Sequence, residues 1–337
     1  MTQTLYAGIA GDTDEGRFIS AGLYRSKDGE GWTRVDGSFT EPPEVHAILT
    51  DPRRPHRVII GSQNGIYLSD DRGDSWQELS APRPELAVWS LLRDPNDPDV
   101  IFAGYEPATL CRSSDDGKTW TRIDLPAAYP HVTAGPEMPK RITGIAVGGA
   151  SAQQIYLSLE IGGLLRSLDG GKNWDAAIDG LYVVEDAVDL HSVVVHPVRC
   201  EQVTVTTRVG AFRTDDCGER WRRLPVPALR GKGSYCRAIA YAPERPQTLF
   251  LGAGNDFDGD KGALFLSRDD GGTWTAADLP GPLKSTVFAI ATNPRLPDQV
   301  HCATKNGGVF SSLNGGASWR YVPLPRGAGH VFSLGLG

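Results

Sequence analysis

The chain has 337 residues, of which 40% are apolar and 22% charged, a composition typical of globular proteins. Its formal net charge is −7 and its Lys and Arg residues do not cluster, which argues against a nucleic-acid partner. No apolar run approaches membrane-spanning length and no secretory leader is recognised, so we expect a cytoplasmic protein with no membrane partner. The five cysteines show no metal-binding spacing and are interpreted as reduced structural thiols.

The first expected strand is Thr4–Gly8, a short apolar segment with no strand before it. A turn motif follows at Ser26–Trp32, and it is one residue shorter than its later copies. The full pattern is Ser-x-Asp-x-Gly-x-x-Trp, with Thr replacing Ser in one copy and Asn replacing Asp in the last. The full copies are Ser69–Trp76, Ser113–Trp120, Ser167–Trp174, Thr214–Trp221, Ser267–Trp274 and Ser312–Trp319.

The spacing of this motif predicts the fold. Successive motif tryptophans are 44, 44, 54, 47, 53 and 45 residues apart, which is the length of a four-stranded propeller blade. Within the motif, Ser and Asp side chains can bond to backbone N–H groups, Gly supplies the left-handed conformation, and Trp packs between sheets. We therefore interpret these Asp residues as turn formers and not as catalytic groups.

A second repeat divides each blade further. Segments bounded by Pro lie between two apolar runs, at Asp51–Pro55, Asp94–Pro98, Ala242–Pro246 and Asn293–Pro297. In the second blade this turn separates an expected strand at Val45–Thr50 from one at Arg57–Gly61, and Gly65–Ser69 and Trp76–Leu79 complete the blade.

The two ends of the chain supply the remaining blade. Val331–Gly337 has the pattern of an innermost strand with nothing after it, and Thr4–Gly8 has that of a second strand. Pairing them would remove the exposed edges of an open sheet. We therefore predict one all-β domain over residues 1–337, a seven-bladed β-propeller of four-stranded antiparallel blades closed by its terminal strands.

The turn motif resembles the Asp-box of the bacterial neuraminidase repeat superfamily. That group includes sialidases, xyloglucan-cleaving glycoside hydrolases, sortilin-type receptors and photosystem II assembly factors. The resemblance covers nearly the whole chain and implies a propeller, but it does not imply a particular activity. Sialidases are expected to have six blades and an Arg-Ile/Leu-Pro motif, which this chain lacks, and xyloglucanases resemble two such propellers in tandem.

Up-and-down connectivity assigns the loops to two faces. The Pro turns and Asp-boxes share one face, and the variable segments occupy the other, where a rigid scaffold usually carries its function. These variable segments are Gly11–Ala21, Pro126–Lys140, Ile178–Asp189, Pro225–Tyr235 and Ala253–Gly262.

The innermost strands align in a five-residue register. The second position is apolar except at Cys236, and the fourth is always Gly, Ala or Ser, as expected close to an axis. Because strand side chains alternate, the first and third positions are predicted to share one side. The polar and aromatic residues at these two positions are Glu44, His46, Trp89, Arg141, Asp189, His191, Tyr235, Arg237 and His330.

Three functions remain open for this ring. Glycoside cleavage would use Glu44 and Asp189 as the carboxyl pair, with Glu185 and Asp186 on a nearby loop. In a sialidase-like site, Arg141, Arg237 and Arg208 would bind a substrate carboxylate beside Tyr235.

The second function is that of a metal-dependent enzyme. His46, His191 and His330 come from three innermost strands and would suit a Zn, Cu or Fe ion, and His131 on a long loop could join them. The alternating carboxylates of Asn255–Gly262 resemble part of a Ca²⁺ loop but lack its distal Glu, so a solvated hairpin is favoured there.

The third function needs no chemistry. The polar site at the channel mouth, on the face opposite the Asp-boxes, would bind a small molecule, a glycan or a protein partner. We favour this binding role slightly over either enzyme class considered separately.

Overall fold

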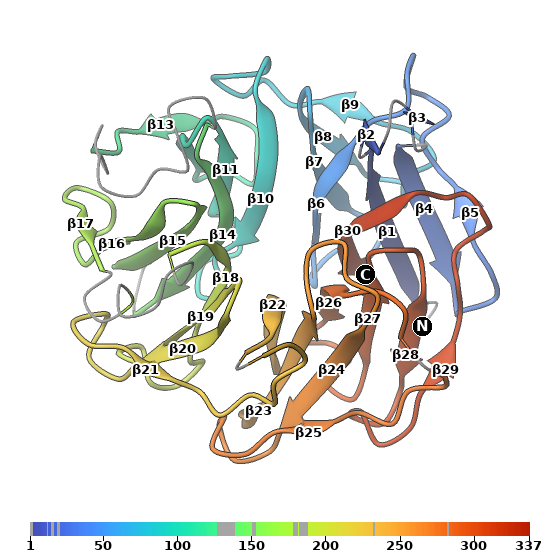
Figure 1. The fold of residues 1–337 in the computed structure, drawn as a ribbon. Helices are drawn as coiled ribbons and strands as arrows, with labels where there is room; N and C mark the ends of the chain where they lie inside the picture. The colour runs from blue at the N-terminus through green and yellow to red at the C-terminus, as the bar shows by residue number, and fades with distance from the viewer. Residues whose placement is uncertain are drawn as a thin grey trace.

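The computed structural model describes residues 3–11, 13–14, 17–18, 21–126, 139–149, 153–177, 181, 188–231, 233–281 and 283–337. In these residues the strands form seven four-stranded antiparallel sheets, together with a two-stranded ribbon of β2 (Thr13–Asp14) and β3 (Arg17–Phe18). The sheets are arranged as blades around a central axis (Figure 1). The predicted seven-bladed, all-β propeller is therefore confirmed. Nothing in the described part of the chain forms a helix of the length and apolarity that spanning a membrane requires.

The four strands of each blade follow one another from the axis outward. Blade 1 contains β30 (His330–Leu336), β1 (Thr4–Ala10), β4 (Gly22–Lys27) and β5 (Thr33–Arg34). Blade 2 contains β6 (Val45–Thr50), β7 (Val58–Ser62), β8 (Gly65–Ser69) and β9 (Gln77–Glu78). Blade 3 contains β10 (Ala87–Arg93), β11 (Ile101–Glu106), β12 (Leu110–Ser113) and β13 (Thr121–Ile123). Blade 4 contains β14 (Arg141–Gly148), β15 (Gln154–Glu160), β16 (Gly163–Ser167) and β17 (Asp175–Ala176).

The last three blades have the same order. Blade 5 contains β18 (Leu190–Val195), β19 (Val203–Thr207), β20 (Gly210–Thr214) and β21 (Arg222–Arg223). Blade 6 contains β22 (Tyr235–Ala242), β23 (Arg245–Gly254), β24 (Gly262–Ser267) and β25 (Thr275–Ala276). Blade 7 contains β26 (Val287–Thr292), β27 (Val300–Thr304), β28 (Val309–Ser312) and β29 (Arg320–Tyr321).

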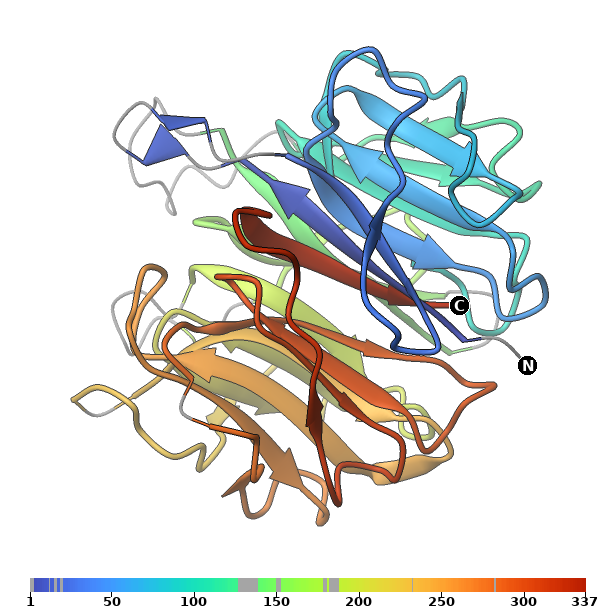
Figure 2. The same ribbon diagram turned by 90° about the vertical axis from the view of Figure 1, so that its right-hand side faces the viewer.

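The two ends of the chain lie side by side in blade 1. β30 pairs antiparallel with β1, from Leu5 opposite Leu336 to Ala10 opposite His330. Thr4 and Gly337 exchange backbone hydrogen bonds of 3.0 and 2.8 Å, and Figure 2 shows both termini on the same side of the molecule. The last strand of the chain is thus the innermost strand of the first blade.

The apolar core lies between neighbouring blades. The second position of every innermost strand is fully buried, Cys236 included. The neighbouring blade comes close at this point, since a Cβ placed on Gly61 of β7 would lie 2.6 Å from Val88 Cγ1 of β10. Gly8 and Gly252 face Val45 and Val287 in the same way. Glycine in a second strand therefore lets the next blade pack closely.

The Asp-boxes act as turn formers. In the second box, Ser69 Oγ accepts the Gly73 N–H at 2.6 Å and donates to Asp71 Oδ1 at 2.7 Å. Trp76 packs into the core between blades 1 and 2, and its indole N–H donates to the Val35 carbonyl at 2.8 Å. The Arg72 N–H donates to the carbonyl of His56 in the Pro turn at 2.8 Å, so box and Pro turn share one face.

Candidate functional site

A β-bulge places one side chain of every innermost strand in the central channel. In all seven strands the pairing register shifts at the third position, and a bulge turns the extra residue out of the regular alternation. All seven of these residues line the channel. They are His46, Trp89, Thr143, His191, Arg237, Phe288 and Phe332.

The channel opens into a cavity of about 570 Å³ on the face opposite the Asp-boxes. First-position residues and the ends of second strands form its rim. The carboxylates at this cavity are Glu44, Glu85, Glu106 and Glu160, and the guanidiniums are Arg141 and Arg237. The cavity lining therefore carries four formal negative charges and two formal positive charges.

An aromatic wall lines the same cavity. The rings of His46 and Trp89 are stacked, with centroids 4.0 Å apart and planes at 12°. Arg141 Cζ lies 4.1 Å from the Trp89 ring centroid. Phe332 lies next to both rings, with centroids 6.0 Å from His46 and 6.1 Å from Trp89, and Phe288 contacts Phe332 edge to face at 5.4 Å. The mouth therefore offers broad π surfaces.

Arg141 holds two of the carboxylates. It forms an ion pair with Glu160, its cross-strand neighbour, and its Nη1 lies 3.6 Å from Glu106 Oε2 of blade 3. The guanidinium therefore occupies the space between these carboxylates. This arrangement binds blades 3 and 4 together at the rim of the cavity.

Arg237 is a cation that contacts no acidic side chain among the described residues. Its Cζ lies 4.6 Å from the Phe288 ring centroid, and its Nη1 is buried without a hydrogen-bond partner among the described residues. It makes no ion pair within the described part of the chain, although its charge contributes to the lowered pKa of Asp189. An orphaned, buried guanidinium nitrogen is costly unless a ligand supplies an acceptor.

Asp189 and His191 form a second polar cluster in blade 5. Asp189 Oδ2 lies 3.6 Å from His191 Nε2, and the His191 side chain is fully buried. Burial raises the pKa of the Asp189 carboxyl, but the nearby His191 side chain, the Ile161 N–H and the Arg237 charge hold it below its usual value. Asp189 is therefore ionised at neutral pH.

The predicted carboxyl pair, Glu44 and Asp189, belongs to separate clusters. Glu44 Oε2 lies 3.6 Å from His46 Nε2 of its own blade, and Asp189 faces His191. The other member of the predicted set, Tyr235, is 3% exposed, and this burial raises the pKa of its phenol far above the usual value. Arg141 and Arg237 do line the cavity, as the strand register suggested.

The three predicted metal-binding histidines do not come together. His46 stacks on Trp89, and His191 contacts Tyr235 with ring centroids 4.5 Å apart. His330 lines a separate surface hollow together with Asn306, Gly307 and residues between 321 and 329. In the described ranges, the residues whose ligand atoms converge within 4.8 Å are instead Glu160, Asp189 and His191. Two of these three residues were among the predicted site residues, and Glu160 was not.

Some proposed participants lie outside the described residues, namely His131, Glu185 and Asp186. The acidic loop at 255–261 is described, and its carboxylates point to different partners: Asp256 to Arg230 at 2.6 Å, and Asp258 to Lys305. A Ca²⁺ loop is therefore not assembled. The loop instead brings Phe257 to the cavity, with Lys305 Nζ 3.6 Å from its ring centroid.

Fold and cavity together define a seven-bladed Asp-box propeller with a charged, aromatic channel mouth. The family model of the photosynthesis system II assembly factor YCF48 matches residues 25–193, which is half of the chain. This chain therefore belongs to that family. Its amino-acid sequence is 29% identical to the photosystem II assembly lipoprotein Ycf48 of Synechococcus sp. (strain CC9902) over 296 residues, covering 87% of this chain and 79% of that protein.

A second group of relatives consists of enzymes. A xyloglucanase of Paenibacillus sp. is 28% identical over 273 residues, which cover 68% of this chain but only 26% of that protein. The chain thus corresponds to about a quarter of this enzyme's length.

Solved structures share the fold. The GH74 enzyme of Niastella koreensis superposes with a TM-score of 0.65 at 17% identity, covering 82% of this chain and 45% of that one. A structure described as YCF48 bound to D1 peptide gives a TM-score of 0.59 at 17% identity, covering 92% and 90% of the two chains.

Proposed function

We propose that this chain is a non-catalytic binding protein that holds an extended segment of a protein partner at the mouth of its central channel. The observation that carries this proposal is Arg237, whose guanidinium lies in an aromatic channel without an ion-pair partner among the described residues. A carboxylate of the partner, from an acidic side chain or a chain terminus, would satisfy it through charge-assisted hydrogen bonds.

The rest of the mouth suits a peptide. Trp89, Phe257 and Phe332 offer apolar ring surface to partner side chains, and Gln63 supplies an amide at the rim for backbone hydrogen bonds. A cavity of about 570 Å³ accommodates a few residues of an extended chain, not a folded domain. The rigid blades keep these groups in place before binding, which lowers the entropic cost.

The family relationship supports the same function. The YCF48 structure that shares this fold is described as bound to D1 peptide, and the match extends over most of both chains. The partner of the present chain is proposed only as a class, a peptide segment that carries a carboxylate and apolar side chains. Its cytoplasmic location stays a prediction.

Glycoside hydrolysis is the second candidate, favoured by the xyloglucanase relatives and by the four carboxylates at the cavity. It requires two carboxyl groups flanking an accessible sugar, one of them protonated. In this cavity Arg141 lies between Glu106 and Glu160, and Asp189, which does not line the cavity, has a lowered pKa. These features favour binding over hydrolysis.

A peptide-display experiment tests the binding function. We expect random 12-residue peptides selected on the wild-type protein to be enriched in acidic residues next to aromatic or aliphatic ones. Arg237→Gln should weaken a selected peptide roughly tenfold or more, the effect expected from losing a charged hydrogen bond. Trp89→Ala should also weaken it, with thermal unfolding recorded for both variants to show that they fold.

Arg122→Gln is the matched control, because Arg122 lies on the outer strand β13 with its side chain about half exposed. It should leave peptide affinity unchanged. Equal losses in Arg122→Gln and Arg237→Gln, or no selectable peptide, would contradict the proposal. Release of reducing sugar from xyloglucan by the wild-type protein would favour the hydrolase instead.

A further inference from the structure

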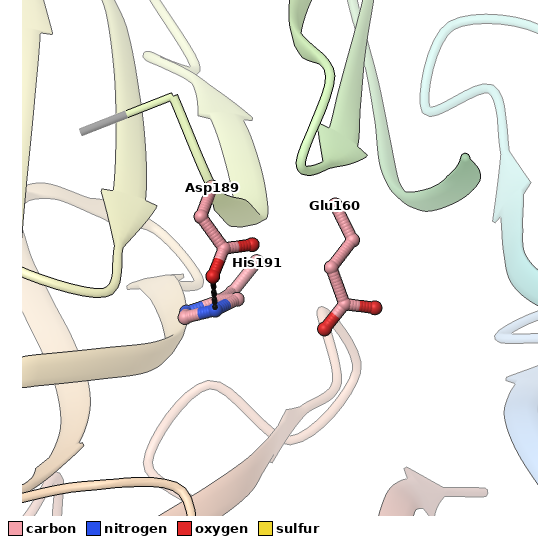
Figure 3. A group of neighbouring side chains, drawn as sticks. All are labelled: Glu160, Asp189 and His191. Carbon is pink, nitrogen blue, oxygen red and sulfur yellow. Dashed lines mark ion pairs between the residues drawn. The ribbon is translucent and has the colours of Figure 1, made fainter. Parts of the chain in front are cut away.

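Three side chains from two neighbouring blades point their ligand atoms at one another. Figure 3 shows the carboxylate of Glu160, at the end of β15, facing Asp189 and His191 at the start of β18. The ligand atoms of all three lie within 4.8 Å of one another. Two carboxylates and an imidazole nitrogen are common ligands of divalent transition metals.

The His191 ring is fixed in the orientation that a metal ligand requires. Its Nδ1 lies 2.7 Å from the carbonyl oxygen of Cys236, which can only accept, so Nδ1 carries the proton and donates. Nε2 then faces the carboxylates, is buried, and has no hydrogen-bond partner among the described residues. Metal-binding histidines are typically held in this way, with the distal nitrogen bonded to a carbonyl or carboxylate.

Asp189 is oriented in the same manner. Its Oδ1 accepts the backbone N–H of Ile161 at 3.3 Å, which leaves Oδ2 to face His191. The separation between Oδ2 and Nε2 is 3.6 Å. Two ligand atoms at about 2.0–2.1 Å from a tetrahedral zinc ion lie about 3.4 Å apart, so this pair already has nearly the required spacing.

Glu160 would complete the set by a small movement. Its carboxylate is bonded to Arg141, and a carboxylate has a second oxygen to offer while that ion pair persists. Arg141 would then orient a ligand instead of competing for it. Arg237 lines the same channel as His191, and its positive charge opposes a second cation nearby.

Blade 2 contains a near-copy of the cluster. Glu44 and His46 occupy the same register positions as Asp189 and His191, and their facing atoms are also 3.6 Å apart. In blade 4, which precedes blade 5, Glu160 pairs across the strands with the first-position residue Arg141. In blade 1, which precedes blade 2, the equivalent residue is Ala10, opposite His330. The blade 2 pair therefore lacks the third ligand, and provides an internal control.

We propose that Glu160, Asp189 and His191 form a binding site for one first-row divalent cation, with zinc as the favoured ion. The inference does not rest on the peptide-binding function. Three protein ligands leave at least one coordination position for water or another donor. The ring nitrogen and the small separation disfavour calcium, which takes more numerous oxygen ligands at longer distances.

Metal titration of the untagged, chelator-treated protein tests the site. Calorimetry with Zn²⁺ should give one equivalent per chain, and Co²⁺ should give a visible d–d absorption that Zn²⁺ abolishes. His191→Ala, Asp189→Asn and Glu160→Gln should each weaken Zn²⁺ binding at least tenfold. Asp189→Asn keeps the acceptor for the Ile161 N–H, so its loss would not reflect misfolding.

His46→Ala is the matched control, and it should leave Zn²⁺ affinity unchanged. Arg237→Gln should tighten Zn²⁺ binding while weakening peptide binding. The metal site and the peptide-binding function can therefore be refuted independently of each other. No stoichiometric Zn²⁺ binding by the wild-type protein would overturn the inference, as would equal losses in His46→Ala and His191→Ala.

Discussion

The close packing of blades can be tested with a single methyl group. Gly61 of β7 has an extended backbone that alanine also adopts, so Gly61→Ala adds only a Cβ. That atom would lie 2.6 Å from Val88 Cγ1, 2.9 Å from Val88 Cβ and 3.0 Å from the Val88 carbonyl oxygen. Favourable carbon contacts lie at about 3.5–4.0 Å. The new methyl therefore overlaps β10 by about 1 Å.

The strand has little room to move away. β7 is hydrogen-bonded to β6 on one side and β8 on the other, so relief requires the two blades to separate. Overpacking of this kind costs about 1–3 kcal/mol, against a gain of about 0.5–1 kcal/mol from replacing a strand glycine. The net loss is up to about 2.5 kcal/mol, which for a chain of this length corresponds to a melting temperature lower by up to about 3–4 °C.

Thermal unfolding of the wild-type protein, three single variants and one double variant tests this explanation. Gly37→Ala is the control, because it is exposed and a Cβ there meets no atom within 4 Å. Val88→Ala removes the Cγ1 overlap but also two buried methyl groups, so it is destabilising alone; the loss caused by Gly61→Ala should be smaller in the Val88→Ala background than in the wild-type background. If Gly61→Ala and Gly37→Ala melt at the same temperature, close packing is not what selects glycine in β7.

Three further predictions concern the Asp-box face. Burial alone raises the pKa of Asp51, but bonds from Arg54 and neighbouring groups lower it to about 2, so its contribution is complete above pH about 4 and is lost as the pH falls towards 2. Asp51→Asn should remove about 2 kcal/mol of this acid-dependent stability. If the melting temperature falls equally between pH 7 and pH 3 in the wild-type protein and in the variant, this prediction is wrong. Ser69→Ala leaves the buried Gly73 N–H without its acceptor and should cost about 1–2 kcal/mol by denaturant unfolding, without changing peptide affinity. Asn314→Asp, in the box that already uses Asn, should be nearly neutral, and a loss like that of Ser69→Ala would contradict the turn-forming role.

The blade architecture could be predicted from the sequence because its signals are local. Ser, Asp, Gly and Trp in each box satisfy one another within a few residues, and their recurrence gives the blade number directly. In blade 2 the expected strands differ from the observed ones by one residue at each end of β7 and at each end of β9. Short outer strands fray into the adjoining Asp-box turn, which explains why β9 is shorter than expected.

The candidate site was harder to predict because its geometry departs from the regular strand period. Simple alternation does not reveal the bulge that turns His46, Trp89 and their equivalents into the channel. Glu160 was missed because it ends a second strand, and its proximity to Asp189 depends on how two blades pack. Phe257 was missed because a loop of charged residues carries it to the cavity.

The pairing of β1 with β30 has a consequence for the order of assembly. Within this chain β1 precedes every other blade strand, whereas its inner partner β30 follows all of them, so the blade begun first is completed last. Blades 2 to 7 are each made from consecutive segments and can form as they are synthesised. Until β30 has been synthesised, β1 carries an unpaired edge, and a chain that lacks β30 should therefore be most prone to aggregation at that strand.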